Sequence, residues 1–262
     1  YINLYTWNML QISGDATNWI FNTGLTFFAL YNRNIDGDLT NWDFSNTLCN
    51  NLTIYNYSNY STNLYGSLSG WTLPNTMQSF QLIYVSGFTS IPTDFSNTVL
   101  SQIQIYFANS HQDINDIDFG HHINNIYIYS SPMVGNIETF FMPSTLSILQ
   151  IYYCNLTGNF SGLTYNSTIS SIYLDYNFIG GGITGIVLPN SLTQLSLSYN
   201  TGITMNFKST PYVSGETVGV FHTKNLTYLY LSSISGITGN LSNLVIDNNL
   251  EALSFYYTDT NS

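Results

Sequence analysis

Charged residues are scarce in this chain, and basic residues are the scarcest of all. Only 6% of its 262 residues are Asp, Glu, Lys or Arg, with three basic against fourteen acidic side chains and a formal net charge of -11. Binding nucleic acid through its phosphates needs clustered Lys and Arg, so the composition excludes nucleic acid as a partner. The polar surface must come from Asn, Ser, Thr and Tyr, which favours an extracellular protein: secreted, on a cell surface or exposed on a virion.

Cysteines and long apolar runs are also few. Cys49 and Cys154 are too few for a disulfide framework, and we expect both thiols to be buried and unbridged. No apolar run approaches the roughly 18 residues of a membrane-spanning helix, so no membrane span is predicted. The sequence begins at Tyr1 without a signal-like segment, which leads us to expect a processed or incomplete chain. Hydrophobic residues make up 44% of the chain, so a large core can be buried and disorder is not expected.

A repeat of 23 residues runs through the middle of the chain. Each unit starts with an apolar residue, followed by one residue of any type and a second apolar residue. Five consecutive steps of 23 residues separate the starts Phe80, Ile103, Ile126, Leu149, Ile172 and Leu195. Looser spacing extends the series to Ile2, Phe28, Leu52, Leu229 and Leu253. Further apolar anchors recur later in each unit. At the position twenty residues after the start they are Leu48, Leu100, Ile123, Leu146, Ile169 and Leu192.

Stacking is the way in which such units can bury their anchors. One unit cannot form a core alone, whereas stacked units form a continuous one. We therefore predict a single repeat-solenoid domain over residues 1–262 with one parallel β-sheet of about eleven short strands. It contains looser repeats at 1–79, regular repeats at 80–200, an insertion at 206–224 and the last repeats at 229–262.

Three segments carry a family resemblance. Residues 146–156, 169–179 and 192–200 fit the pattern L-x-x-L-x-L-x-x-N/C-x-L, so the chain resembles leucine-rich repeat proteins of plant-type or bacterial kind, in a viral or cell-surface setting. The resemblance implies a solenoid with a parallel sheet on one face. It also implies that Cys154, Asn177 and Asn200 hydrogen-bond loop backbone inside the solenoid, a task that most outer units must meet in another way. The convex segments are rich in Asn, Gly, Ser, Thr and Pro, which predicts loop, turn and extended structure there.

Tyrosine dominates the positions that should point outward. Side chains alternate between the two faces of a strand, so the flanking apolar residues point inward and their neighbours point outward. The candidate ligand- or partner-binding residues are Tyr106, Tyr127, Tyr129, Tyr152, Tyr153, Tyr173, Asp175, Tyr176 and Tyr199. Two interpretations stay open. The rings stack across strands for stability alone, or they form a contact surface for a glycan or a protein.

No motif of a catalytic, metal or cofactor site is present. His121-His122 and Asp36-Gly37-Asp38 match no zinc or calcium pattern, and no nucleophile motif occurs, so we predict neither an enzyme nor a metal or cofactor. The predicted function is extracellular recognition or adhesion through the tyrosine face. The alternative is a structural subunit of an extracellular filament or virion.

Two further questions concern self-association and modification. Neither end of the sequence carries a capping segment, which predicts either flanking domains outside this sequence or self-association end to end. Asn-x-Ser/Thr triplets, such as those at Asn155 and Asn225, are no more frequent than chance and leave glycosylation open.

Overall fold

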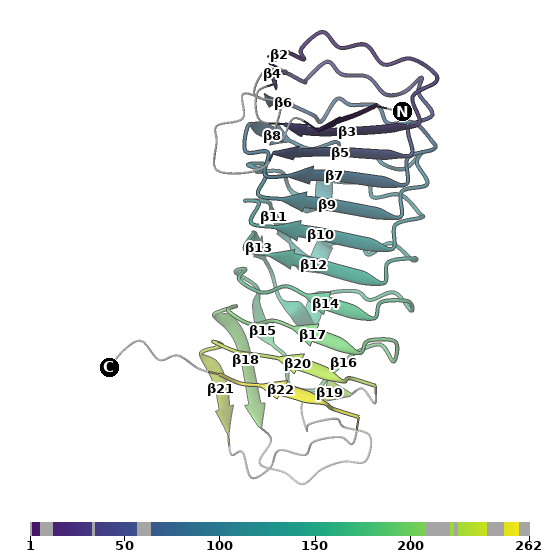
Figure 1. Ribbon diagram of the computed structural model, residues 1–262. Coiled ribbons are helices and arrows are strands. Elements are labelled where there is room, and N and C mark those ends of the chain that lie inside the picture. The colour runs from purple at the N-terminus through teal and green to yellow at the C-terminus, as the bar shows by residue number, and fades with distance from the viewer. Residues whose placement is uncertain are drawn as a thin grey trace, which may run out of the picture. The chain divides into compact units, whose positions relative to one another are not determined.

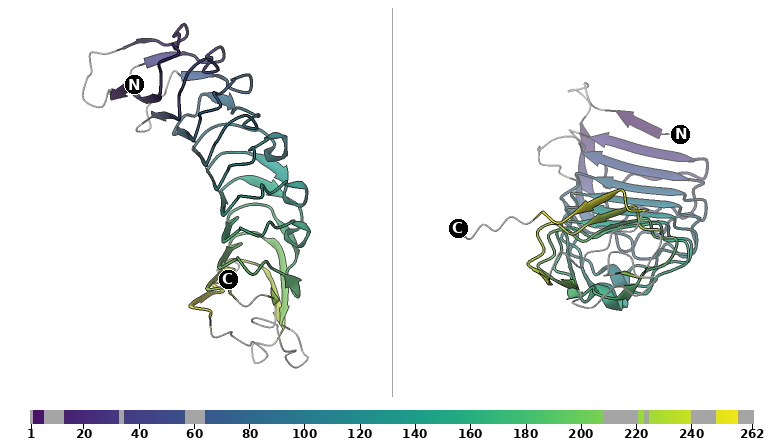
Figure 2. Two further views of the ribbon diagram at one scale, coloured as in Figure 1. Left: turned by 90° about the vertical axis from the view of Figure 1, so that its right-hand side faces the viewer. Right: turned by 90° about the horizontal axis from the view of Figure 1, so that it is seen from below.

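The chain forms a parallel β-solenoid of stacked coils, with no more helix among its described residues than short 3-10 turns (Figure 1). The computed structural model describes residues 2–5, 13–32, 35–56, 64–207, 221–222, 225–239 and 249–256. The chain divides into two compact units, Tyr1–Val134 and Gly135–Ser262, called unit 1 and unit 2 below. The turned views of Figure 2 show each of them winding in successive coils. No helix in the described ranges is long and apolar enough to cross a membrane.

Unit 1 carries one large and one small parallel sheet. The large sheet consists, in sequence order, of β1 (Ile2–Tyr5), β3 (Phe27–Asn32), β5 (Asn51–Asn56), β7 (Ser79–Ile83), β9 (Gln102–Tyr106) and β10 (Asn125–Tyr129). The small sheet consists of β2 (Gly14–Asp15), β4 (Ile35–Asp38), β6 (Leu64–Ser67) and β8 (Phe88–Ser90), and one 3-10 turn, η1, covers Ile114–Asp116. In Figure 1 the small sheet lies on the side toward which the large-sheet strands point.

Unit 2 repeats this plan with shorter strands. Its large sheet consists, in sequence order, of β12 (Ile148–Tyr152), β14 (Ser171–Tyr173), β17 (Gln194–Ser196), β20 (Tyr228–Tyr230) and β22 (Ala252–Ser254). Smaller parallel pairings join β11 (Val134–Asn136) with β13 (Asn155–Thr157), β16 (Ile186–Val187) with β19 (Phe221–His222), and β15 (Gly180–Gly182) with β18 (Gly202–Phe207) and β21 (Gly236–Gly239). Two 3-10 turns, η2 (Ile137–Thr139) and η3 (Phe160–Gly162), lie between them.

The pairing register confirms the repeat. Phe80 lies opposite Ile103 and Ile103 opposite Ile126 in unit 1, while Leu149 lies opposite Ile172 and Ile172 opposite Leu195 in unit 2. The looser starts pair in the same way, Ile2 with Phe28 and Leu229 with Leu253 among them. Buried and half-exposed side chains alternate along β7, β9, β10 and β12, so the predicted inward and outward faces are correct.

One predicted anchor is wrong. The Leu48 side chain is 54% exposed, whereas the neighbouring Cys49 is fully buried. The coil from Phe28 to Leu52 is 24 residues long (52 − 28), one residue longer than the repeat, so the inward position moves along the chain by one. The other predicted anchors of this set, Leu100, Ile123, Leu146, Ile169 and Leu192, are buried.

The asparagine position has the role that the resemblance implies. In unit 2 the Asn177 Nδ2 group donates to the carbonyls of Ile151 (2.9 Å) and Leu174 (3.0 Å), and Oδ1 accepts from Leu156 N–H (3.1 Å). One coil later Asn200 makes the same kind of contacts. These amides satisfy buried backbone groups that no strand pairs.

Other residues meet the same need elsewhere. In unit 1 the Ser131 hydroxyl accepts a hydrogen bond from Ala108 N–H at 3.2 Å. In unit 2 the Cys154 thiol donates to the Tyr152 carbonyl at 3.3 Å. Cys49 and Cys154 are both buried thiols, as predicted, and burial raises the pKa of the Cys49 thiol to about 11. Such a thiol is unreactive at neutral pH.

Candidate binding surface

Tyrosines of unit 1 occupy one register position on the outward face of its large sheet. Tyr31, Tyr55, Tyr106 and Tyr129 share this position, which Ile83 fills in β7. The ring centroids of Tyr31 and Tyr55 lie 5.5 Å apart, and those of Tyr106 and Tyr129 lie 6.2 Å apart in an edge-to-face arrangement. The rings are half-exposed, so each offers part of its surface to a partner.

The remaining unit 1 candidate, Tyr127, lies on the same face. It is half-exposed and opposite Gln104 in β9. Burial, followed by the nearby Tyr127 hydroxyl, raises the pKa of Tyr106. The structure therefore brings Tyr106, Tyr127 and Tyr129 together on one face of the sheet.

The strands of the regular repeats end before the fifth residue of each unit, counted from the repeat start. The residue at the corresponding position has a left-handed backbone, with φ between 47° and 60°. These residues are Tyr84, Phe107 and Ser130 in unit 1, and Tyr153, Tyr176, Tyr199 and Ser233 in unit 2. The conformation is uncommon outside glycine and costs about 1–3 kcal/mol per residue.

Hydrogen bonds between coils hold this turn in place. Phe107 N–H donates to the Tyr129 carbonyl at 2.8 Å, and Tyr176 N–H donates to the Ser198 carbonyl at 3.0 Å. The pairing thus continues past the strand while the side chain is redirected. Sequence reasoning missed this turn because its recurring signal, an aromatic residue four residues after five of the six regular repeat starts, does not reveal a dihedral angle.

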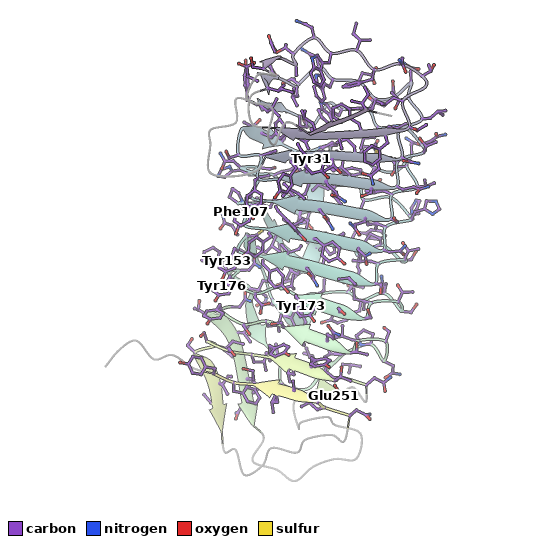
Figure 3. All side chains as sticks on the ribbon, viewed as in Figure 1. Tyr31, Phe107, Tyr153, Tyr173, Tyr176 and Glu251 are labelled. Atoms are coloured by element: carbon purple, nitrogen blue, oxygen red, sulfur yellow. The ribbon has the colours of Figure 1, made fainter. Side chains whose placement is uncertain are left out.

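The redirected rings of unit 2 form what we call the edge stack: Tyr153, Tyr176 and Tyr199. Ring centroids are 3.9 Å apart in both pairs, with interplanar angles of 16° and 10°. Figure 3 shows Tyr153 and Tyr176 near the arrowheads of the strands, whereas Tyr173 lies over the sheet. Hydrogen bonds with the Tyr153 and Tyr199 hydroxyls raise the pKa of Tyr176. Since the rings cover one another's faces, the stack presents ring edges and hydroxyls. Tyr84 and Phe107 of unit 1 stack similarly, at 4.6 Å and 10°.

Asp175 holds the outward position that Tyr152 holds one coil earlier. Its carboxylate is nevertheless buried, with 8% of the residue exposed. The Ser198 N–H donates to Oδ1 at 2.7 Å, and the Ser196 hydroxyl donates to the same oxygen. Burial raises the pKa of this carboxyl above its ordinary value, although the serine hydrogen bonds act in the opposite direction.

Tyr173 connects Asp175 with further tyrosines. Its ring centroid lies 6.1 Å from that of Tyr152, and its hydroxyl donates to the Gln194 side chain. Burial raises the pKa of Tyr173, and the nearby Tyr230 and Asp175 add to this rise.

In unit 2, two tyrosines outside the nine candidates belong to the same face as Tyr173. Tyr230 lies opposite Ser196, and Tyr228 donates a hydrogen bond to Glu251 Oε2 at 2.8 Å. Tyr230 follows a repeat start by one residue, as Tyr127 and Tyr173 do, and this spacing was the signal that could have identified it. No group of three or more His, Cys, Asp or Glu side chains that could hold a metal occurs in the part of the chain that the structure describes.

No family model matches this chain, and no curated protein matches it either.

Proposed function

We propose that this protein is a non-catalytic extracellular module for recognition or adhesion, which binds a glycan or a protein through the tyrosine-rich face of its large sheet. In unit 1 this surface would use the predicted binding residues Tyr106, Tyr127 and Tyr129 on the sheet. In unit 2 it would use Tyr152, Tyr173 and Asp175 on the sheet, and Tyr153, Tyr176 and Tyr199 of the edge stack. Tyrosine combines a large apolar ring with a polar hydroxyl and is enriched in protein interfaces.

One observation carries the proposal: aromatic residues occupy a strained turn that does not require them. Ser130 and Ser233 adopt the same left-handed conformation as Tyr153, Tyr176 and Tyr199, so the backbone forms this turn without a ring. The Tyr153 side chain is 45% exposed and that of Tyr199 is 37% exposed, so neither ring fills the core. Exposed aromatic rings in a row are what a contact surface needs.

A leucine-rich-repeat-like solenoid is the scaffold that we propose for this surface. The pattern over residues 146–156, 169–179 and 192–200 supports it, and so do the backbone hydrogen bonds of Asn177 and Asn200. Rigid, regularly spaced strands would hold the rings in a fixed array, which reduces the entropy lost on binding.

A triple variant tests the proposed function. Wild-type chain and Tyr129→Ala/Tyr152→Ala/Tyr176→Ala are applied to arrays of oligosaccharides and of extracellular proteins. Truncating an aromatic anchor often costs about 2 kcal/mol, so we expect the triple variant to bind at least about tenfold more weakly. Circular dichroism checks that it is folded.

Tyr65→Ala is the matched control. Tyr65 is 52% exposed but lies in β6, outside the large sheet, so its removal should leave binding unchanged. Equal binding by wild type and the triple variant would leave ring stacking as the only role of these tyrosines.

A further inference from the structure

The tyrosine face of unit 2 has one interruption. Along one row of outward positions, Tyr173 in β14 lies opposite Ser196 in β17, and Ser196 lies opposite Tyr230 in β20. A serine thus stands between two tyrosines on alternate strands. Their backbone positions are roughly 9.6 Å apart, which is two strand spacings of about 4.8 Å. A six-membered sugar ring fits between two aromatic rings at this spacing.

The base of this interruption is polar. Ser196 is 5% exposed, Ser198 is 7% exposed, and both hydrogen-bond to the Asp175 carboxylate. The Ser198 hydroxyl also hydrogen-bonds to the carboxylate, but a carboxylate offers about four lone-pair sites and therefore keeps accepting capacity. No Lys or Arg occurs among the described residues, so no basic side chain there neutralises the carboxylate.

The fold has no need of a charge at this position. Equivalent outward positions hold Tyr152 one coil earlier and Ser198 one coil later, and both are compatible with the sheet. Burying a carboxylate without a basic partner costs stability. A costly charge inside an aromatic surface is typical of a functional group rather than of a structural one.

We propose that Tyr173, Asp175, Ser196 and Tyr230 form a saccharide subsite within the binding face, an inference that rests on the proposed function. The ligand is a neutral, hydroxyl-rich sugar. One of its rings lies over Ser196 between the two tyrosines, and its hydroxyls donate to Asp175. Hydrogen bonds to a carboxylate are about twice as strong as neutral ones, so Asp175 is the main polar determinant.

The surrounding groups favour a sugar over a cation. Serine and tyrosine hydroxyls both donate and accept, which matches the hydroxyls of a sugar, whereas an ammonium group only donates. Tyr173 and Tyr230 are half-exposed and cover Ser196, so they move aside when the sugar enters.

Two variants of the full chain test the subsite. Wild type is first applied to an array of neutral hexose and N-acetylhexosamine oligosaccharides, and the tightest binder is then titrated calorimetrically into each variant. Asp175→Asn removes the charge and keeps the shape. Ser196→Tyr fills the space between Tyr173 and Tyr230 with a third tyrosine, the residue that both neighbouring strands hold at this position. We expect each to weaken binding at least about tenfold.

Asp116→Asn is the control, because Asp116 is an exposed acid in η1 of unit 1 and its replacement makes the same change in net charge. Its affinity should stay within about twofold of wild type. If Ser196→Tyr fails to fold, Asp175→Asn decides the question alone, since it introduces no bulk.

The outcomes separate the subsite from the proposed function. Sugar binding that is lost in the Tyr129/Tyr152/Tyr176 triple variant but kept in Asp175→Asn would overturn the subsite and keep the function. Wild-type binding to proteins or amines alone would also overturn the subsite. Wild-type binding to neither sugars nor proteins would overturn both.

Discussion

Asp175 is the residue at which stability and binding make opposite demands. It is 8% exposed, no Lys or Arg occurs among the described residues, and Tyr173 is a titratable neighbour. Burial raises its pKa, so folding favours the protonated carboxyl. Its stabilising contribution is therefore fully present below the unfolded-state pKa of about 3.9 and is lost as the pH rises through the folded-state value.

Asp175→Asn should therefore stabilise the protein at neutral pH. The asparagine oxygen can still accept from Ser196 and Ser198, while the cost of burying a charge disappears. We expect the free energy of unfolding to rise by about 1–3 kcal/mol at pH 7 and the difference from wild type to vanish near pH 3. Urea unfolding of both proteins at several pH values measures this. A variant that is less stable than wild type at pH 7 would show that the carboxylate supports the fold.

At the scale of the element, the left-handed turn after the strands of the regular repeats allows backbone strain and ring stacking to be measured separately. Ser130 has φ 47° without a ring stack, whereas Tyr176 has φ 55° and stacks on both Tyr153 and Tyr199. Glycine adopts positive φ at no steric cost. Ser130→Gly should therefore stabilise the protein by about 0.5–1 kcal/mol. Tyr176→Gly should destabilise it by roughly 1–2 kcal/mol, because each stacked pair contributes about 0.5–1.5 kcal/mol.

Thermal unfolding of the two glycine variants checks this order. Ser130→Ala is the control, since alanine keeps the strain and removes only the hydroxyl. If both glycine variants gain stability, the rings contribute too little to offset their own strain, and the edge stack must exist for another reason.

The same elements show what the sequence could predict. Apolar residues spaced 23 apart predicted the register from Phe80 to Ile126 and from Leu149 to Leu195, because this spacing reflects stacking of one coil on the next. The left-handed turn at Phe107 or Tyr176 depends on a hydrogen bond to the following coil, which residue type does not encode. The burial of Asp175 depends on contacts with the next coil, where its hydrogen-bond partners Ser196 and Ser198 lie 21 and 23 positions along the chain. The exposure of Leu48 depends on one extra residue in its coil.

At the scale of the whole molecule, the described residues bear on the predicted insertion and on the predicted end-to-end association. Most of the insertion at 206–224 lies outside the described residues. Among the residues that are described, β1 pairs only with β3 in the large sheet of unit 1, and β22 pairs only with β20 in that of unit 2. A strand with one unpaired edge can pair with another chain, which is the physical basis of the alternative role as a filament or virion subunit.

The net charge of -11 opposes such self-association and makes it dependent on salt. The screening length falls from about 30 Å at 0.01 M salt to about 3 Å at 1 M, so end-to-end association should increase over this range. Light scattering and electron microscopy of the chain at fixed concentration measure it. Ala252→Lys, in β22, should suppress association because a charged side chain on an edge strand hinders pairing. Gln104→Lys, in β9 between β7 and β10, makes the same change in charge on an inner strand and should not suppress it. A monomer at every salt concentration would leave the recognition module as the better account, because a structural subunit has to assemble.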